Sequence, residues 1–469
     1  MLDKIKRIFA ATDMTEGTPW KKIAIFAIPM LLGNIAQQLY NTVDSIVVGK
    51  YIGDNALAAV GSAGPIVTLL IALFVGISTG ASILVSQFFG ARSREDLSWA
   101  VGNCLTLTVI CSIIIMIVSM IIVRPLLVLL KTPDSIIDWC VSYILILFIG
   151  NIGSAFYNIL TGILRGLGDA FSALVYLLVA TILNIGLDVL FVAKFNMGVN
   201  GVAYATIISQ TLSAVLCFIR LKKMSDLFDL SWKHLALRKA YAGRTVRLGL
   251  PTGLTQVIFS MAMVVVQSLT NCFGEMFIAA NVIIMRVDGF AMLPNYSFGT
   301  AMTTYAGQNV GARKMDRVVK GARQGMLLSV GTATVLTILV LVFGKWLMGL
   351  FTETPELIDL AYRMMCIIAV GYITMGITQS VSGVMRGAGD TITPMWISML
   401  TTFVIRIPIA YAISFATRTE ALPYGDSRCI YISLLVSFLS SAGITMICYL
   451  KGRWRRKAQE KMDALEQAA

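Results

Sequence analysis

The sequence predicts an all-α polytopic membrane protein, with twelve transmembrane helices arranged as two parallel six-helix repeats. Three observations lead to this prediction: an apolar composition, a set of motifs that occurs twice, and a skewed distribution of basic residues. Of the 469 residues, 57% are hydrophobic and 13% are charged, which is about half the charged share of a soluble domain. A soluble chain of this length would need more polar surface than this composition supplies.

The motifs that occur twice indicate an internal repeat. Gly90–Arg92 recurs as Gly311–Arg313, both reading Gly-Ala-Arg, at a spacing of 221 residues. Arg165–Asp169 recurs at the same spacing as Arg386–Asp390, both reading Arg-Gly-x-Gly-Asp. A spacing shared by separate motifs indicates two homologous halves. Since each half holds an even number of expected helices, both halves begin on the same side of the membrane and the repeats are parallel, which suggests a transporter.

Twelve apolar segments are long enough to cross a bilayer as helices. They cover residues 22–48, 57–88, 97–123, 136–161, 170–193, 199–219, 249–272, 277–306, 321–344, 358–384, 392–415 and 428–450. The domain organisation follows from them: an N-lobe at 1–219, a cytoplasmic amphipathic linker at 220–248, a C-lobe at 249–450 and a basic cytoplasmic tail at 451–469.

The linker carries an amphipathic stretch, Leu230–Lys239. We expect this stretch to lie flat on the cytoplasmic leaflet, with Trp232, Leu235 and Leu237 towards the acyl chains. The single histidine of the chain, His234, falls within it. We expect this histidine to be solvated rather than functional.

The basic residues orient the protein. With the N-terminus placed inside, 28 of the 38 Lys and Arg fall in cytoplasmic segments, as the positive-inside rule requires. The formal net charge of +13 is therefore explained by topology, and no nucleic-acid partner is expected. We expect a multi-pass protein of a prokaryotic inner membrane, surrounded by lipid, with both termini in the cytoplasm.

Several function classes are disfavoured by what the sequence lacks. Its eight cysteines are scattered without C-x-x-C spacing, which is typical of apolar packing rather than of disulfides or metal ligands. No G-x-x-x-x-G-K-[ST] motif is present, so an ATP-driven mechanism is not expected. With one histidine and no clustered cysteines, we predict neither an enzyme nor a cofactor.

Polar residues inside the expected spans mark the candidate site, because an ionisable group in a bilayer is expensive. In the first span, Asn34, Gln37, Asn41 and Asp44 are spaced by three, four and three residues, which places them on one helical face. The fifth span carries a second stripe, with the same kind of spacing, at Thr181, Asn184 and Asp188. Such stripes should face a bundle interior or a wet cavity.

The two acids, Asp44 and Asp188, are expected at similar depths in the membrane. Asp44 lies roughly 6 Å and Asp188 roughly 8 Å below the outer ends of their spans, at 1.5 Å per residue. They could meet within the N-lobe, with Asn184 and Asn41 supplying amide oxygens. Desolvation and mutual repulsion favour binding of a proton by such a pair, and the same oxygens could instead hold Na⁺. The alternatives are an acid that hydrogen-bonds to neighbouring amides as structural glue, or acids wetted at the outer rim.

The second half has a different polar pattern. Its second span carries Asn281, Asp288 and Asn295 at heptad spacing, with Arg286 nearby. Asp288 is expected near mid-membrane. It could pair with Arg286 or with Arg406 of the eleventh span as a structural ion pair, or it could line a cavity together with Arg286 and Asn281.

Further motifs are Ala-Ile-Pro-Met around Pro29, Leu-Pro-Thr-Gly from Leu250 and Asn-Thr-Val-Asp-Ser ending at Ser45. The chain also contains Ser-Gln-Phe-Phe-Gly-Ala-Arg, Gly-Gln-Asn-Val-Gly-Ala-Arg and both Arg-Gly-x-Gly-Asp turns. Taken in order over residues 15–450, these motifs resemble those of the multidrug and toxic compound extrusion (MATE) family. The resemblance implies two six-helix bundles around a central cavity, alternating access, and export of organic, often cationic, compounds by H⁺ or Na⁺ antiport.

The resemblance also implies roles for individual residues. Asp44 matches the acid of the family's first helix, and Asn184 and Asp188 match the Asn and Asp of its fifth, which are the cation-site positions of the DinF-like branch. Thr206 looks like the hydroxyl residue that joins them. The NorM-like branch carries further acids in its seventh and tenth helices, and this sequence lacks them. These matches imply an N-lobe site for H⁺, or for Na⁺ held by Asp44, Asn184 and Asp188.

The main rival function is a flippase for lipid-linked precursors, which a related fold performs. A flippase should show a lateral groove lined with basic residues for a pyrophosphate head group. In-membrane basic residues are few here, and the in-membrane acids favour cations instead. We therefore predict a secondary active exporter of small organic substrates, acting as a monomer.

Overall fold

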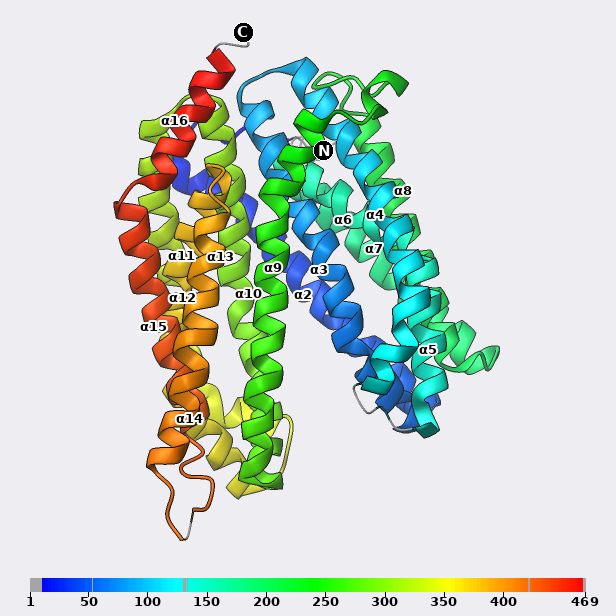
Figure 1. Ribbon diagram of the computed structural model, residues 1–469, viewed down its shortest axis with the longest axis vertical. Helices are drawn as coiled ribbons and strands as arrows, with labels where there is room; N and C mark the ends of the chain where they lie inside the picture. Colours follow the sequence, from blue (N-terminus) through cyan, green and yellow to red (C-terminus); the bar gives the residue numbers. More distant parts are fainter. Residues whose placement is uncertain (1–10, 53, 130–131, 133, 421, 467–469) are drawn as a thin grey trace. The chain divides into compact units, whose positions relative to one another are not determined.

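The computed structural model describes residues 11–52, 54–129, 132, 134–420 and 422–466. Within these ranges it is helical, apart from turns and one isolated β-bridge between Thr419 and Leu422 (Figure 1). The elements of the N-terminal half are α2 (Pro19–Tyr51), α3 (Asp54–Gly90), α4 (Arg94–Leu129), α5 (Asp134–Ile149), α6 (Asn151–Gly166), α7 (Ala170–Asp188), the π-helical η1 (Val189–Lys194), α8 (Gly198–Lys222) and the short η2 (Trp232–Leu235). Those of the C-terminal half are α9 (Lys239–Thr270), the short η3 (Asn271–Phe273), α10 (Glu275–Gly311), α11 (Met315–Gly349), α12 (Pro355–Gly387), α13 (Ile392–Met399), the π-helical η4 (Leu400–Arg406), α14 (Ile407–Ala416), α15 (Cys429–Leu450) and α16 (Arg453–Glu466).

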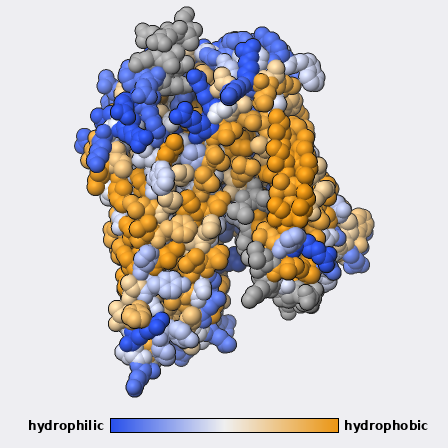
Figure 2. Space-filling view, in the orientation of Figure 1, coloured by the Kyte–Doolittle hydropathy of each residue, from blue (hydrophilic) through white to orange (hydrophobic). Residues whose placement is uncertain are grey.

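The helices agree with the predicted membrane fold. Eleven of the described helical spans are long and apolar enough to cross a membrane, and the number is twelve if the pair α5 and α6, bent by 53°, is counted as one span. Large aliphatic side chains such as Ile121, Ile182 and Val342 are exposed. Hydrophobic side chains cover the length of the helices in each unit, while hydrophilic ones gather at the helix ends (Figure 2). The prediction of an all-α polytopic membrane protein is confirmed.

The chain forms two compact units whose boundaries differ from the expected lobes. The first unit contains residues 1–13 and 32–253, and the second contains 14–31 and 254–469. The start of α2 therefore packs with the second unit, and the start of α9 packs with the first. Helical periodicity could not reveal this exchange, because it says nothing about which bundle a given turn of a helix packs against.

Backbone groups just before α2 fix it to the second unit. The Met14 amide donates to Gln308 Oε1 at 2.9 Å, and Asn309 Nδ2 donates to the Met14 carbonyl at 3.1 Å. Arg317 adds a hydrogen bond from Nη2 to the Glu16 carbonyl at 2.8 Å. Gln308 and Asn309 are buried in α10. The first turns of α2 are thus held by polar groups of the C-terminal half.

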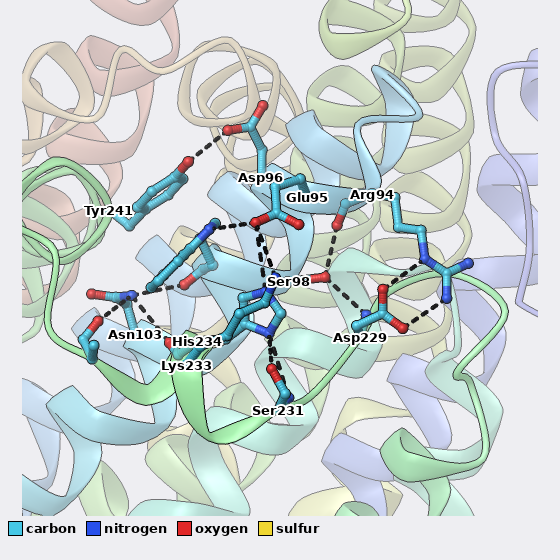
Figure 3. Close-up of polar contacts among 12 residues, drawn as sticks. Arg94, Glu95, Asp96, Ser98, Asn103, Asp229, Ser231, Lys233, His234 and Tyr241 are labelled. Carbon is cyan, nitrogen blue, oxygen red and sulfur yellow. Dashed lines mark hydrogen bonds and ion pairs between the residues drawn. The ribbon is translucent and has the colours of Figure 1, made fainter.

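The linker is fixed to α4 of the first unit in a similar way (Figure 3). The buried Asn103 accepts from the Arg238 amide at 2.7 Å and donates to the Ala236 carbonyl at 3.3 Å. Arg94 donates from Nε and Nη2 to both carboxylate oxygens of Asp229, at 3.0 and 2.9 Å. This fork of hydrogen bonds lowers the pKa of Asp229 below its ordinary value.

The prediction that His234 is solvated is wrong. Its side chain is fully buried, it meets the Trp99 ring edge-on with centroids 5.0 Å apart, and its Nδ1 lies 3.0 Å from Ser231 Oγ. The linker can approach α4 this closely because residue 102 is a glycine, where a Cβ would collide with the His234 carbonyl oxygen. Trp232 remains 89% exposed, so it stays free to meet the leaflet.

The repeated Arg-Gly-x-Gly-Asp turns use their acids as helix caps. Asp169 accepts from the amide and hydroxyl of Ser172 at 3.0 and 2.7 Å and pairs with Arg220 Nε at 2.8 Å. Its counterpart Asp390 accepts from the Thr393 hydroxyl at 2.7 Å and pairs with Lys457 Nζ at 2.7 Å. In both turns the last glycine has a positive φ, which a residue with a Cβ rarely adopts.

The C-terminal segment is structured over much of its length. Residues Arg453–Glu466 form α16, and Lys457 is the residue of this helix that pairs with Asp390. Trp454 is fully buried, stacks on Tyr449 with centroids 5.0 Å apart, and donates from Nε1 to the Tyr449 carbonyl at 2.9 Å. The segment that we expected to be a basic tail is therefore a helix packed on its own unit.

Candidate functional site

Two acids of the first unit meet at the contact between α2 and α7. One amide atom of Asn184 lies 2.8 Å from Asp44 Oδ1 and 3.3 Å from Asp188 Oδ2, and hydrogen bonding assigns it as the nitrogen, so that one amide bridges both carboxyl groups. The two carboxyl groups are also hydrogen-bonding neighbours of each other. Asp188 and Asn184 have no exposed surface. The helical spacing brought Asn184 and Asp188 to one face of α7, and packing against α2 brought Asp44 to them.

Tyr40 extends the site towards α8. Its hydroxyl lies 3.2 Å from Asn184 Oδ1 and 3.3 Å from Thr206 Oγ1, so its single proton can serve either acceptor. The side chain is buried. Thr206 is therefore connected to the acids through Tyr40. Tyr143, on α5, also interacts electrostatically with Asp44 and Asp188.

The orientation of Asn184 differs from the expectation. We expected Asn184 and Asn41 to present amide oxygens to the acids, but Asn184 turns its amide nitrogen to them and its oxygen to Tyr40. The reason is that carboxylate oxygens only accept hydrogen bonds, so the amide nitrogen faces them when no cation lies between. Asn41 is exposed and accepts from Gln37 Nε2 at 3.5 Å. Asn34 and Gln37 are partly buried on the same helix.

The ionisable groups of this site are acidic, and none of the described residues supplies a basic partner to them. In the described part of the chain, no basic side chain is among the groups that interact with Asp44 or Asp188. The Oδ1 atom of Asp188 is buried without a hydrogen-bond partner among these residues. Buried charge is tolerated only when it is compensated. The arrangement therefore suits a small cation, either a proton shared between the carboxyl groups or Na⁺ among their oxygens.

The second unit holds a separate polar cluster, with a different charge balance. Asp288 on α10 interacts electrostatically with Arg406 at the end of η4. The buried Asn281 accepts from the Tyr431 hydroxyl at 2.6 Å. Arg286 is exposed. Of the two arginines that we considered, Arg406 is the one whose charge acts on Asp288. Neither Asp288 Oδ1 nor Arg406 Nε has a hydrogen-bond partner among the described residues.

Sequence reasoning missed the tyrosines of both clusters. Tyr40 stands four residues before Asp44, so helical spacing alone could have placed it on the same face. The tyrosines of the second unit, Tyr372 and Tyr431, lie on helices without an in-membrane acid, and no spacing rule connects them to Asp288. Only tertiary packing brings these tyrosines near Asp288, where the Tyr372 hydroxyl donates to Met365 Sδ at 3.0 Å and the Tyr431 hydroxyl donates to Asn281 Oδ1.

Comparisons with known proteins identify the family. The MatE family model matches residues 29–190 and 251–412, which is once in each half of the chain. A probable multidrug resistance protein, YoeA of Bacillus subtilis (strain 168), is 32% identical over 410 residues, covering 86% of this chain and 89% of the relative. Another, YpnP of the same organism, is 28% identical over 450 residues, covering 95% and 98%.

Solved structures agree on the fold. The crystal structure of MATE in complex with MaL6 superposes with a TM-score of 0.86 at 24% identity, covering 97% of this chain and 99% of that one. An outward-facing multidrug resistance MATE transporter of the MOP superfamily gives a TM-score of 0.86 at 23% identity, with the same coverage. The repeated motifs, the membrane helices and these matches lead to one conclusion: the chain belongs to the MatE family and is an ion-coupled efflux transporter of the multidrug and toxic compound extrusion type.

Proposed function

We propose that Asp44 and Asp188 form the coupling-cation site of this exporter, with Asn184 and Thr206 as supporting groups. The observation that carries the proposal is the bridging by Asn184 of the buried Asp188 and the half-buried Asp44, with no basic partner among the described residues. As in the DinF-like branch of the family, the site lies in the N-terminal half. The cation is H⁺ or Na⁺, taken up from outside and released inside.

The close contact between the carboxyl groups supports proton binding. Two ionised carboxylates repel and cannot hydrogen-bond to each other, whereas a single shared proton converts the repulsion into a hydrogen bond. Na⁺ would need oxygen ligands, so the amide of Asn184 would have to turn its oxygen towards the acids. Tyr40 could then donate to Thr206 instead. A proton can thus bind to the site in its present geometry, whereas Na⁺ binding requires the side chains to rearrange.

Coupling requires that the two conformations differ in cation affinity. A bound cation can shift the population of inward- and outward-open states only by as much as it binds one state better than the other. One charge that crosses about 100 mV supplies roughly 2.3 kcal/mol. At about 1.4 kcal/mol per tenfold, this sustains a gradient of roughly 40-fold for a neutral substrate, to which the concentration gradient of the ion adds. A monovalent cation exchanged one for one moves no net charge, so its export is driven by the concentration gradient of the ion alone.

The substrate class follows from the same charge. Export of an organic cation against entry of H⁺ or Na⁺ lets one negative site exchange the two kinds of ligand. Asn34, Gln37 and Asn41 continue the polar face of α2 from Asp44 and are proposed to line the substrate path in the first unit. Asn281, Arg286 and Asp288 are the corresponding candidates in the second unit. We propose a monomer in a prokaryotic inner membrane, with both termini in the cytoplasm.

Coupled efflux in proteoliposomes tests the site. Asp44→Asn and Asp188→Asn keep the size of each side chain and remove its charge. With an imposed H⁺ or Na⁺ gradient, each variant should export a fluorescent organic cation no faster than protein-free liposomes do. Exchanging the H⁺ gradient for a Na⁺ gradient identifies the coupling ion. Wild-type efflux by both variants would rule out the assignment.

A further inference from the structure

Each repeated Arg-Gly-x-Gly-Asp turn begins with an arginine whose side chain runs back along its own helix. Arg165 stands in the last turn of α6, and its Nη2 donates to Ser78 Oγ on α3 at 3.4 Å. Ser78 Oγ itself donates at 2.6 Å to the carbonyl of Asn158, which precedes Arg165 on α6. A long side chain on a helix lies over the turn before its own Cα. The guanidinium is therefore inside the span, roughly one to two turns from the end of the helix.

The second unit repeats this arrangement. Arg386 stands in the last turn of α12, and its Nη2 lies 3.5 Å from the point where a Cβ on Gly299 of α10 would be. Gly299 follows Ser78 by 221 positions, just as Arg386 follows Arg165. In both halves, the glycine three residues before the arginine packs against this same residue of the neighbouring helix. The fold therefore places one guanidinium at an equivalent position inside each unit.

Neither arginine has an acidic partner among the described residues. The acid of each turn pairs with another basic residue: Asp169 with Arg220 Nε at 2.8 Å in the first unit. In the second unit, Asp390 pairs with Lys457 Nζ at 2.7 Å. The Nε atom of Arg165 is buried and has no hydrogen-bond partner within the described ranges. Because a guanidinium stays charged and has five N–H donors, an uncompensated one inside a membrane bundle marks a candidate site for a ligand.

The face of α6 that carries Arg165 is polar and is not sealed. Ser154, Asn158, Thr161 and Arg165 are spaced by four, three and four residues, so they share one side of the helix. All of them except the buried Thr161 are half-buried. The side that is exposed as lipid contact requires carries Ile152, and helical spacing places it far from Ser154 and Arg165. A ligand of this face therefore approaches from the interior of the unit.

We propose that Arg165 and Arg386 are oxyanion-binding residues, and that each holds, in its own unit, the carboxylate or phosphate group of an organic compound that the exporter carries. The guanidinium fork matches two oxygens of such a group. Because the polar face of α6 is turned away from its lipid side, a soluble compound fits better than a membrane lipid. This inference rests on the proposed function for the idea of an exported compound. It extends the substrate class from organic cations to compounds that also carry a negative group.

A matched pair of dyes tests the proposal. The probes are a rhodamine with a free benzoate group and the methyl ester of the same dye, which lacks only the negative charge. Their binding to the purified full-length protein is measured by fluorescence anisotropy, without a cation gradient. The wild type should bind the acid at least about tenfold more tightly than the ester, as a hydrogen bond between charged groups implies. Arg165→Gln combined with Arg386→Gln should remove this preference. Arg244→Gln combined with Arg323→Gln, which removes two exposed arginines, should keep it.

Three results would overturn the proposal. One is equal binding of the acid and the ester by the wild type, which decides the question even if the variants do not fold. Another is a preference for the acid that persists in the folded Arg165→Gln and Arg386→Gln double variant. The third is a loss of bound phospholipid from that variant in phosphorus analysis, because the arginines would then hold lipid head groups. A wild type that prefers the acid but shows no coupled efflux would refute the proposed function and leave the oxyanion sites in place.

Discussion

Replacement of Asn184 by leucine should separate proton coupling from sodium coupling by the sign of its effect. Asn184 Nδ2 donates to Asp44 at 2.8 Å and to Asp188 at 3.3 Å. Both bonds are stronger to ionised carboxylates than to protonated ones, so they favour the cation-free pair. Leucine has a similar size and no polar group, so Asn184→Leu removes both bonds while it keeps the packing.

The size of the expected pH shift follows from the two hydrogen bonds that Asn184→Leu removes. A hydrogen bond to a charged group contributes about 1.5–3 kcal/mol, and the longer bond contributes less than the shorter one. We take about 2–4 kcal/mol for their sum. At about 1.4 kcal/mol per tenfold, the cation-free state loses a factor of roughly 30 to 700 relative to the proton-bound state. If the ion is H⁺, half-maximal coupling should therefore occur at a pH about 1.5 to 3 units higher than in the wild type.

The same substitution has the opposite effect on sodium. Na⁺ binds to oxygen ligands, and leucine removes the amide oxygen that could serve as one. The concentration of Na⁺ required for half-maximal efflux should then increase. The assay is initial efflux of a fluorescent cation from proteoliposomes over a series of outside pH values or Na⁺ concentrations.

A matched control uses an amide of the same unit outside the site. Asn158 Nδ2 donates to the Ser154 carbonyl of its own helix at 2.8 Å, so Asn158→Leu should leave both titrations near their wild-type positions. If Asn184→Leu moved neither titration by more than about threefold, well below the shift derived above, the bridging role of the amide would be wrong.

Three further predictions concern the parts that hold each unit together. Gly102→Ala places a Cβ against the His234 carbonyl. This overpacked contact should destabilise the packing of the linker on α4 by about 1–3 kcal/mol, so trypsin should cleave the linker faster. Unchanged cleavage would contradict the packing of the linker on α4. Asp390→Asn removes the charge that pairs with Lys457 at 2.7 Å. The free energy of unfolding should fall by at most about 3–5 kcal/mol, the value for a buried pair, and the midpoint of thermal unfolding should fall with it. An unchanged midpoint would show that the pair does not stabilise the unit. Asp229 has a lowered pKa because of its arginine partner. Its contribution to the stability of the packed linker is therefore complete above the ordinary aspartate pKa of about 4, and it is lost as the pH falls through the lowered pKa. Because both side chains are exposed, Asp229→Asn should speed linker cleavage slightly at neutral pH, and this difference should vanish in about 1 M salt; a difference that persists in salt would point to another cause.

The sequence predicted most of the fold, for a local reason. A membrane helix must satisfy its backbone within itself and present an apolar surface to lipid, so each span is visible as a run of apolar residues. The repeat of Arg165–Asp169 at Arg386–Asp390 doubled this signal and established two halves. Helical spacing also placed Asn184 and Asp188 on one face, so the acids of the candidate site could be named before any coordinates.

Only the tertiary structure decided which residues meet. It placed Arg406, rather than the exposed Arg286, within electrostatic reach of Asp288. It also set the amide nitrogen of Asn184 beside the acids, as hydrogen bonding assigns it, and buried His234 in a linker that composition marks as solvated. The physical reason is that spacing along one helix defines a face but not the neighbour that covers it. Contacts such as Tyr40 with Thr206 join residues that are 166 positions apart, and the packing of whole helices determines which such distant groups come into contact.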